Sequence, residues 1–403
     1  MINNETGMRE LCYVVKIDGI EPIPGKDRVE CAKVKGWTVM VRKGQFKVGD
    51  LGVYFEIDSK TPETEAFAFL ASKHYAIKTQ KYRIPDGHFY SQGLLMNLEE
   101  VGLNAADYKE GDFLTEKLGV TYYVVEDNKR KAKENPDAKI NAALGRHPEF
   151  AKKYGKTIKK NKFLRWFFTL IWGKKKDSET AFPTKFPYVH KTDQERCENM
   201  TWVLEDKTPY IVTQKCDGSS GTYILERKRS IFGDTYEFYV CSRNVRQLTP
   251  TQKSFYDENY YWKCAIKYDI ETKMKDYLSK NPNLDYICWQ GEVCGPNIQK
   301  NPHGLTETHL FCFHMTDSEK GRYDIREAAK IWNEYKMETV PIVYGNYILP
   351  DDFEEFKETA DGYYDPSVCE GKTNRKREGF VYYKTTDPNF SFKNVSREYL
   401  MHH

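Results

Sequence analysis

One stretch decides the fold of the second half of this chain: Pro209-Tyr210-Ile211-Val212-Thr213-Gln214-Lys215-Cys216-Asp217-Gly218-Ser219-Ser220-Gly221-Thr222-Tyr223-Ile224-Leu225. Its opening residues are β-branched or aromatic, which is typical of a strand leading into the lysine. The closing residues have the same character, and the Asp-Gly pair between the two runs is a tight-turn signal. We therefore expect a β-hairpin that holds Lys215 at its mouth.

Five more motifs follow this stretch along the chain. They are Ser242-Arg243-Asn244, Gln290-Gly291-Glu292-Val293-Cys294-Gly295-Pro296, Leu310-Phe311-Cys312-Phe313-His314, Arg377-Glu378-Gly379-Phe380-Val381-Tyr382-Tyr383 and Ser391-Phe392-Lys393-Asn394-Val395. Each motif is a weak signal alone, but five in this order after Lys-x-Asp-Gly form a strong one. Over about residues 182–400 the chain resembles the covalent nucleotidyltransferases, which comprise DNA ligases, RNA ligases and RNA capping enzymes.

This resemblance implies a role for each matching residue. Lys215 would be the nucleophile that carries the nucleotide. The nucleotide-binding residues would be Arg196, Asp217, Gly218, Arg243, Glu292, Phe313, Glu378 and Lys393. Among them, Glu292 would also bind the ribose hydroxyls and Phe313 would stack on the adenine of ATP. Arg243 and Lys393 would steady the phosphate, and Arg196 would bind the outgoing pyrophosphate.

The chemistry explains why these residue types are needed. A lysine amine has a pKa of about 10.4, so at neutral pH it is protonated and a poor nucleophile. A divalent metal on the α-phosphate would disfavour the ammonium form and stabilise charge on the phosphorus oxygens. Because Mg²⁺ keeps most of its waters, we expect Mg²⁺ or Mn²⁺ to be held through water by Asp217, Glu292 and Glu378.

Simpler interpretations exist for the same residues. Lys215 could lie exposed on an ordinary hairpin, and Glu292 and Glu378 could belong to surface ion pairs. Phe313 could be a core residue, because strand alternation puts Phe311 on the same face. Arg196 could be an exposed charge on a helix, since residues 191–196 carry a capping-box pattern that predicts a helix start.

Two positions depart from the family pattern. The family often has Lys-x-Lys at the last motif, whereas this chain has Ser391 before Lys393. One phosphate contact would then be missing or supplied by Lys384. The aromatic strand usually continues into Asp, where this chain has His314, so the role of that position stays open.

Residues 1–121 have the pattern of an all-β domain. Residues 51–57 alternate strictly and put four apolar side chains on one face, and residues 36–43 and 90–96 predict two further strands. Short strands at this spacing favour a small barrel, and the words Asp27-Arg28-Val29-Glu30 and Lys47-Val48-Gly49-Asp50 resemble an OB-fold module. A β domain of unrelated type would give a similar pattern.

Residues 122–181 predict a basic helical linker. Ten basic and no acidic residues lie between positions 151 and 176, which leaves 52 basic against 59 acidic residues elsewhere. The run from Phe163 to Trp172 is aromatic and flanked by lysines. An amphipathic helix between domains is the favoured interpretation, followed by RNA contact and then an interfacial membrane helix. For RNA binding, the candidates are Lys174, Lys175 and Lys176.

The expected architecture is α+β: an OB-fold barrel (1–121), the linker (122–181) and a nucleotidyltransferase domain (182–403) of ATP-grasp-like antiparallel sheets and helices. Helices are expected over 255–278 and 324–336. DNA ligases and capping enzymes carry the OB module behind the catalytic domain, whereas here the barrel precedes it. This order resembles the ATP-dependent RNA ligases with an N-terminal OB domain. That family seals 3′-hydroxyl and 5′-phosphate RNA ends through lysyl-AMP and RNA-adenylate.

Three alternative functions stay open, namely a DNA ligase, a GTP-dependent capping guanylyltransferase and an inactive nucleic-acid-binding module. The expected partner is RNA with 3′-hydroxyl and 5′-phosphate ends in a nicked duplex, and the expected protein is a monomer. Ten scattered cysteines without a Cys-x-x-Cys pair argue against zinc ribbons and secretion. With no signal pattern and no run long enough for a membrane span, we expect a cytoplasmic location, in the host if the chain is viral or phage-encoded.

Overall fold

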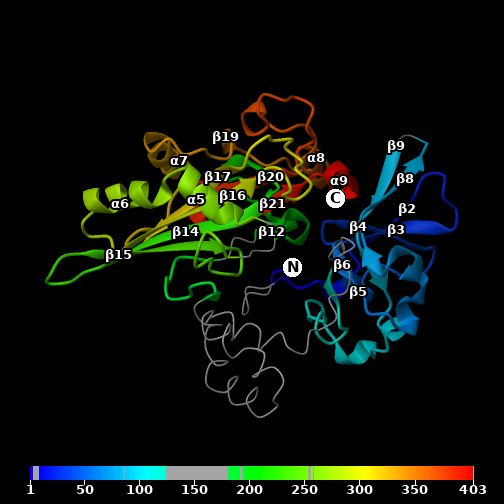
Figure 1. The fold of residues 1–403 in the computed structure, drawn as a ribbon. Coiled ribbons are helices and arrows are strands. Elements are labelled where there is room, and N and C mark those ends of the chain that lie inside the picture. Colours follow the sequence, from blue (N-terminus) through cyan, green and yellow to red (C-terminus); the bar gives the residue numbers. More distant parts are fainter. Residues whose placement is uncertain are drawn as a thin grey trace, which may run out of the picture.

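Two folded domains lie side by side in the computed structural model of this chain (Figure 1). The structure describes residues 1–2, 9–85, 87–123, 180–190, 194–252, 256 and 258–402. Most of the predicted linker, including the aromatic run 163–172 and Lys174, Lys175 and Lys176, lies outside these described residues. Its predicted helical character and RNA contact therefore stay predictions.

The N-terminal domain is built from short antiparallel strands. One sheet has the order β1 (Cys12–Lys16), β5 (Leu51–Phe55), β10 (Leu94–Met96), and a second has the order β2 (Gly19–Pro22), β3 (Val29–Val34), β4 (Trp37–Arg42). The smaller strands are β6 (Ser59–Lys60), β7 (Ala76–Ile77), β8 (Gln80–Ile84), β9 (Gly87–Ser91) and β11 (Thr121–Tyr122).

The central strand β5 is buried on both faces. Val53 and Phe55 pack in one apolar cluster with the 3₁₀ helix Glu65–Lys73, and Tyr54 packs in a second cluster with Trp37. Ile57, which the alternation put on the same face as Val53 and Phe55, lies instead in the second cluster, because β5 ends at Phe55. The predicted strand 90–96 is divided into β9 and β10. Gly93 makes the break: its φ is +96°, and an added Cβ would lie 2.5 Å from the Tyr54 ring.

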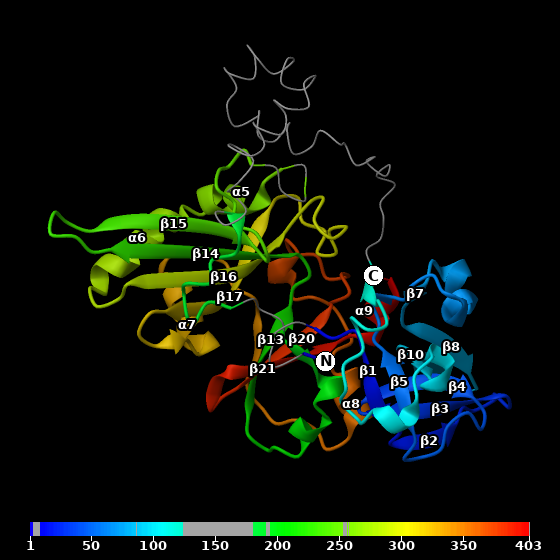
Figure 2. The ribbon, with the colours of Figure 1, turned by 90° about the horizontal axis from the view of Figure 1, so that it is seen from below.

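The C-terminal domain contains two five-stranded sheets. The first has the order β12 (Glu195–Arg196), β21 (Asp387–Val395), β20 (Gly379–Lys384), β13 (Tyr210–Lys215), β19 (Ile342–Tyr347). The second has the order β15 (Thr235–Ser242), β14 (Ser219–Lys228), β16 (Tyr286–Cys294), β17 (His309–Asp317), β18 (Gly321–Arg322). Figure 2 shows the two sheets as separate layers that meet near the start of β14.

The predicted hairpin around Lys215 is wrong. Both strands exist, but β13 pairs with β20 and β19, while β14 pairs with β15 and β16. The Asp-Gly pair therefore does not return the chain onto its own strand; it carries the chain from one sheet into the other. The reason is tertiary, because distant strands pair with β13 on both of its edges and with β14 on both of its edges, which leaves neither strand an edge for the other.

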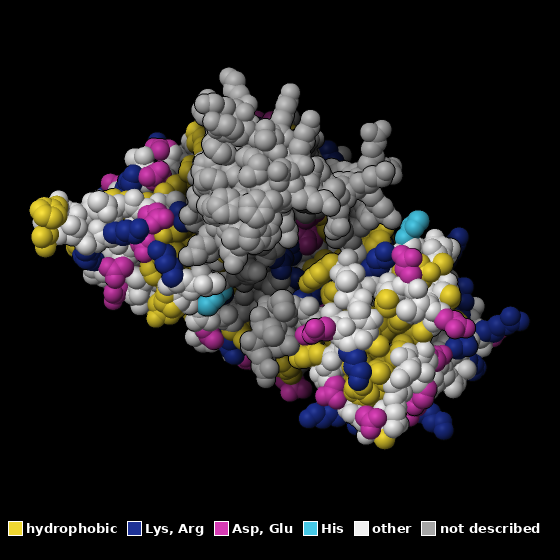
Figure 3. All heavy atoms as spheres, turned by 60° about the horizontal axis from the view of Figure 1, so that its bottom comes forward, with side chains coloured by type: hydrophobic (Ala, Val, Ile, Leu, Met, Phe, Trp, Pro, Cys, Tyr) yellow, Lys and Arg dark blue, Asp and Glu magenta, His cyan; other side chains and the backbone are white. Residues whose placement is uncertain are grey.

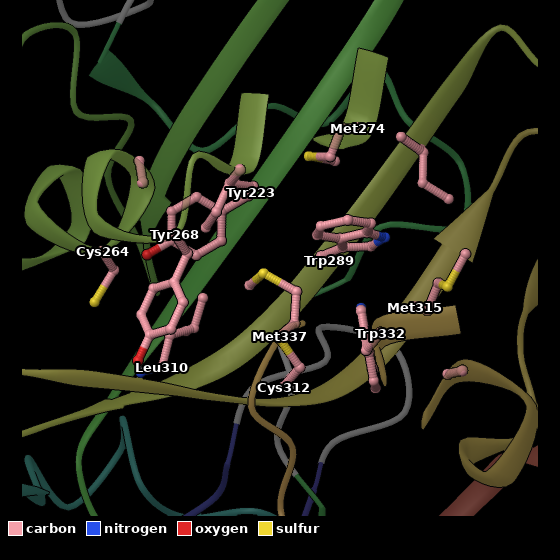
Figure 4. Packing of buried hydrophobic residues seen from close by; sticks show 14 of the residues in the cluster. Tyr223, Cys264, Tyr268, Met274, Trp289, Leu310, Cys312, Met315, Trp332 and Met337 are labelled. Carbon is pink, nitrogen blue, oxygen red and sulfur yellow. Dashed lines mark hydrogen bonds between the residues drawn. The ribbon is translucent and has the colours of Figure 1, made fainter. Parts of the chain in front are cut away.

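Three helices cover one face of the second sheet: α5 (Tyr260–Lys267), α6 (Ile270–Lys280) and α7 (Ile325–Glu334). Their apolar side chains and those of the sheet form the largest core cluster, in which Trp289 and Trp332 are fully buried (Figure 4). The helices predicted over 255–278 and 324–336 are thus present. The first is divided because Asp269 adopts a left-handed φ of 48°.

The helix predicted to start near Thr192 is also wrong. Residues 191–193 lie outside the described residues, and Glu195 and Arg196 form β12, which pairs in parallel with Phe392 and Lys393 of β21. Pairing with a distant strand overrides the local capping pattern. The first sheet is completed by α8 (Phe353–Glu358), whose Phe356 packs against Tyr382 and Phe392.

The C-terminal helix α9 (Arg397–His402) lies between the two domains in both views (Figures 1 and 2). Leu400 packs against the core cluster of the N-terminal domain that contains Trp37 and Tyr54. Arg397 forms a two-bond ion pair with Glu354, with distances of 2.6 and 2.9 Å. The helix therefore joins the domains through apolar packing.

The surface carries mixed charges. Lysines, arginines and acidic residues alternate over the visible face (Figure 3), and hydrophobic atoms gather at the tip of the hairpin between β14 and β15. There Ile231 and Phe232 are each 94% exposed. Among the described residues, no helix is long and apolar enough to cross a membrane.

A buried ion pair provides a test of the domain's stability. The Lys357 amine lies 2.7 Å from Glu198 and has an exposed fraction of zero, with Asn394 as a further partner. We expect Glu198→Ala to lower the free energy of unfolding by about 3–5 kcal/mol, because it leaves an ammonium buried and unpaired. Chemical denaturation followed by tryptophan fluorescence measures the loss.

The double variant Glu198→Leu/Lys357→Met is the control. Since it removes both charges together, it should recover much of the lost stability. A single variant as stable as the unmodified protein would show that the pair contributes nothing.

Candidate active site

Lys215 is the last residue of β13, at the point where the chain leaves the first sheet. Its amine forms an ion pair with Glu378 at 2.8 Å, and the two side chains are 23% and 13% exposed. The register explains this contact, because Lys215 pairs with Gly379, the residue after Glu378. Lys215 is therefore not an exposed lysine on a hairpin, and Glu378 is not part of a surface ion pair.

Two glycines allow the backbone to approach this closely. A Cβ added at Gly218 would lie 2.4 Å from the carbonyl oxygen of Val293 and 3.0 Å from Cγ of Glu292. A Cβ added at Gly379 would lie 2.1 Å from the carbonyl oxygen of Asn394, and φ there is +146°. The close approach at Gly218 places Glu292 of β16 next to the short segment in which the chain passes from the first sheet to the second.

Asp217 is held by two residues that sequence reasoning missed. Its backbone N–H donates to Nε2 of His303 at 3.2 Å, and the hydroxyl of Tyr399 donates to its carboxylate. Because Nε2 of His303 accepts, Nδ1 carries the proton and donates to the carbonyl of Val368 at 3.1 Å. Burial lowers the pKa of His303 to about 4, so the ring is neutral at physiological pH.

The site holds one amine and three carboxyl groups. Burial, together with the charges of Asp217 and Glu378, raises the pKa of Glu292 to about 8 against the opposing effect of the Lys215 ammonium. Burial and the charge of Glu378 likewise raise the pKa of Asp217 to about 7. For Lys215, burial acts to lower the pKa, but the carboxylates of Glu378 and Glu292 outweigh it and raise the pKa well above its usual value.

The excess of buried negative charge is suited to a cation. In the parts of the chain that the structure describes, no three His, Cys, Asp or Glu side chains converge closely enough to hold a metal ion directly. The donor set fits the hydrated Mg²⁺ or Mn²⁺ expected from the sequence, because such an ion keeps waters between itself and the carboxylates.

Phe313 lies at a bulge in β17. Gln290 pairs with His314 and Gly291 with Cys312, so Phe313 is the extra residue that pairs with neither. Its ring packs against the cluster that contains Cys216, while Phe311 is buried in that cluster. Both rings therefore belong to one apolar cluster, in which Phe311 is a core residue and Phe313 is half-buried.

Arg243 directly follows β15, and Lys393 lies on β21. Ser242 pairs with Gly221, which also pairs with Gly291, so Arg243 follows at the end of the sheet that carries Glu292. Lys393 pairs with Val381 on one side and with Arg196 on the other. It therefore lies two strands from β13 in the first sheet.

Arg196 is not an exposed helix charge. It is 5% exposed and reaches Asp58 of the N-terminal domain at 3.1 Å. Two of its guanidinium nitrogens, Nε and Nη1, are buried without a hydrogen-bond partner among the described residues. Such atoms are expected to find an acceptor when a ligand binds, so Arg196 can bind an anion at the domain boundary.

The two departures from the family pattern have different outcomes. Lys384 pairs with Asp206 and lies opposite Tyr210, at the far end of β13 from Lys215, so it does not replace the residue missing at Ser391. His314 is buried with neither ring nitrogen bonded to a described residue, and burial lowers its pKa well below the usual range. It is therefore a neutral residue of the sheet.

The comparisons with known proteins agree with this geometry. Residues 11–98 match an OB-fold domain, and residues 208–395 match the RNA ligase family. No curated protein matches the sequence.

Similar solved structures include Naegleria gruberi RNA ligase as an apo mutant, as a mutant with ATP and Mn, and with PPi. Each is 25% identical and covers 98% of this chain and 98–99% of its own, with TM-scores of 0.70, 0.71 and 0.70.

The fold and the lysine-centred site define a covalent nucleotidyltransferase. Within that class, residues 208–395 match the RNA ligase family and residues 11–98 match an OB-fold domain, so the chain is similar to an RNA ligase whose OB-fold domain precedes the ligase domain. The α+β architecture expected from the sequence is confirmed, and so is the resemblance on which it rested.

The raised pKa of Glu292 makes a prediction about stability. A glutamate titrates near pH 4.3 in an unfolded chain but near pH 8 in this fold, so the folded state binds more protons between these values. Stability from Glu292 is therefore highest at about pH 4 and falls as pH rises to about 8. We expect Glu292→Gln, which cannot ionise, to raise the thermal midpoint at about pH 9 and not at about pH 5.

Thermal unfolding of the ligand-free protein across this pH range measures the difference. Glu319→Gln, on an exposed turn, is the matched control and should shift neither midpoint. If Glu292→Gln shifted the thermal midpoint equally at both pH values, ionisation of Glu292 would carry no cost to the stability of the folded protein.

Proposed function

We propose that this protein is an ATP-dependent RNA ligase that joins 3′-hydroxyl and 5′-phosphate RNA ends through lysyl-AMP and RNA-adenylate. The observation that carries the proposal is the amine of Lys215, held 2.8 Å from Glu378 beside two further carboxyl groups. The domain limits expected from the sequence, 1–121, 122–181 and 182–403, belong to the same proposal.

In the first step, Nζ of Lys215 attacks the α-phosphorus of ATP. An N–P bond forms, the P–O bond to pyrophosphate breaks, and the amine gives up its proton. Glu378 holds the amine in position and is the nearest acceptor for that proton. A divalent cation, Mg²⁺ or Mn²⁺, supplies positive charge that lowers the pKa of the amine and offsets the charge of the phosphate.

Two later steps transfer the nucleotide. AMP moves from Lys215 to the 5′-phosphate of an RNA end, which frees the amine and forms a phosphoanhydride. The 3′-hydroxyl of the second end then attacks the same 5′-phosphorus, and AMP leaves with the bonding electrons. The net result is one phosphodiester bond, one AMP and one pyrophosphate for each ATP.

The remaining site residues would bind the nucleotide. Phe313, half-buried at its bulge, would stack on adenine, and Glu292 would accept from the ribose hydroxyls. Arg243 and Lys393 would contact phosphate. The unpartnered nitrogens of Arg196 would bind the leaving pyrophosphate.

The choice of substrate is supported by domain order and by the comparisons. The OB-fold domain precedes the ligase domain, and the similar Naegleria gruberi RNA ligase has been solved with ATP and Mn. We propose nicked duplex RNA as the substrate, a monomeric enzyme and a cytoplasmic setting.

Covalent labelling tests the nucleophile. With α-labelled ATP and Mg²⁺ or Mn²⁺, the protein should acquire a label that survives denaturing electrophoresis, and Lys215→Ala should lose it completely. GTP in parallel, followed by sealing of nicked RNA and nicked DNA, separates the ligase from a capping enzyme and a DNA ligase.

Lys330→Ala is the control, because Lys330 is an exposed lysine on α7 that makes no ion pair with a described residue. Label on Lys215→Ala would place the nucleophile elsewhere. An unlabelled native protein would favour an inactive binding module.

The hydroxyl of Tyr399 gives a prediction about pH dependence. Its hydrogen bond lowers the pKa of Asp217, so Tyr399→Phe should raise that pKa and leave less carboxylate at neutral pH. We expect slower lysyl-AMP formation at about pH 7 and recovery at about pH 9, as measured by single-turnover labelling.

Tyr363→Phe, at a nearby exposed tyrosine, should leave the pH profile unchanged. A Tyr399→Phe rate lowered equally at all pH values would contradict an effect through Asp217.

A further inference from the structure

A pocket lined in part by Tyr399 adjoins the segment that carries Lys215 and Asp217. It has a volume of about 260 Å³ and lies between the loop after β16 and the segment before β20. Its lining includes Lys300, Asn301, Asn374, Arg375, Lys376 and Tyr399, and it contains three cationic side chains and no acidic one. None of the residues predicted from the sequence belongs to this pocket.

The charges in this pocket are only partly compensated. Lys376 pairs with Glu398 at 2.7 Å. Lys300 and Arg375 form no side-chain hydrogen bond or ion pair with any residue that the structure describes, and Nε of Arg375 is buried without a partner. Two unpaired cations in one concave site are suited to a phosphate, which accepts a guanidinium fork and an ammonium together.

The Arg375 side chain packs against the backbone of Gly304. Its guanidinium lies flat against Gly304, where an added Cβ would be 2.4 Å from Nη2. Only glycine leaves room for it, and the φ of +66° at Gly304 also favours glycine.

The loop that presents Lys300 has an unusual backbone. Asn297, Gln299, Lys300 and Asn301 all have left-handed φ angles, between 44° and 65°. Non-glycine residues adopt this conformation at a cost, and such residues cluster at functional sites. The loop is anchored three residues after Lys300, where buried His303 accepts from the backbone of Asp217.

One side chain connects this pocket to the nucleophile. Tyr399 lines the pocket, and its hydroxyl donates to Asp217, two residues from Lys215. The cations expected to bind ATP, Arg243 and Lys393, follow or lie in strands β15 and β21, and neither lines the pocket. A phosphate bound here would thus lie next to the reacting groups but apart from that set.

We propose that this pocket binds a backbone phosphate of the RNA strand that enters the active site, with Arg375 and Lys300 as its ligands. The inference rests on the proposed function, because only a polynucleotide substrate presents further phosphates at this position. Its contribution is electrostatic and independent of base identity.

The test separates RNA binding from nucleotide binding. Affinity for a nicked RNA duplex is measured over a series of salt concentrations for the full chain, for Lys300→Ala/Arg375→Ala and for the control Lys330→Ala. The double variant should bind RNA about tenfold or more weakly, and the slope of log K against log salt should shrink by about 0.7–0.9 for each lost contact. In the double variant, lysyl-AMP formation and its dependence on ATP concentration should stay unchanged. The control Lys330→Ala should match the unmodified protein in every one of these measurements.

A charge reversal at Lys300, which is exposed, tests RNA binding in a variant that should fold normally. Lys300→Glu changes a surface side chain only, should keep the thermal midpoint, and should weaken RNA binding more than Lys300→Ala does. Unchanged RNA affinity and salt slope in both variants would overturn the inference. Normal RNA binding together with a weaker affinity for ATP or inorganic pyrophosphate would also overturn the inference, because it would assign the pocket to the nucleotide phosphates.

The proposed function fails separately from the pocket. If the unmodified protein forms no lysyl-AMP and seals no RNA, the ligase assignment is wrong, and the RNA-binding measurements alone still decide whether Lys300 and Arg375 hold a phosphate.

Discussion

The chain passes from one β-sheet to another within the residues between Lys215 and Ser219, and the arrangement of the site depends on that crossing. Register on one side places Glu378 beside the lysine, and register on the other places Glu292 opposite Ser220. Asp217 lies between them. Gly218 and Gly379 make the crossing sterically possible, because no side chain fits at either position. The site is therefore a property of two sheets in contact rather than of a loop.

This geometry leaves the ligand-free protein with unfavourable electrostatics. Three carboxyl groups share one ammonium in a largely buried space, and burial raises the pKa values of Asp217 and Glu292 into the neutral range. Such strain is common where a protein must bind cations and phosphates rather than maximise its own stability. The scaffold around the site is correspondingly rigid, with His303 fixing the backbone and β strands fixing the side chains.

Sequence reasoning found most residues of the site but not the way in which the backbone joins them. The β-branched runs correctly predicted β13 and β14, yet nothing local indicates that each pairs with a strand far along the chain. His303 and Tyr399 were missed because they lie 86 and 182 residues from Asp217, and no motif or periodicity connects such positions. Likewise, the bulge at Phe313 is defined only by the pairing of β17 with β16, which no local pattern indicates.

Helix α9 contacts both domains, with Leu400 packed against the core of the OB-fold domain and the Tyr399 hydroxyl bonded to the carboxylate of Asp217. The OB-fold domain is therefore no freely exchangeable module. An OB-fold domain taken from another ligase would need an apolar surface that fits Leu400. Without that surface, α9 would lose its packing, and Asp217 would lose the hydrogen bond from Tyr399. Recombination between distant relatives at this boundary should yield working chimaeras only where helix and barrel have diverged together.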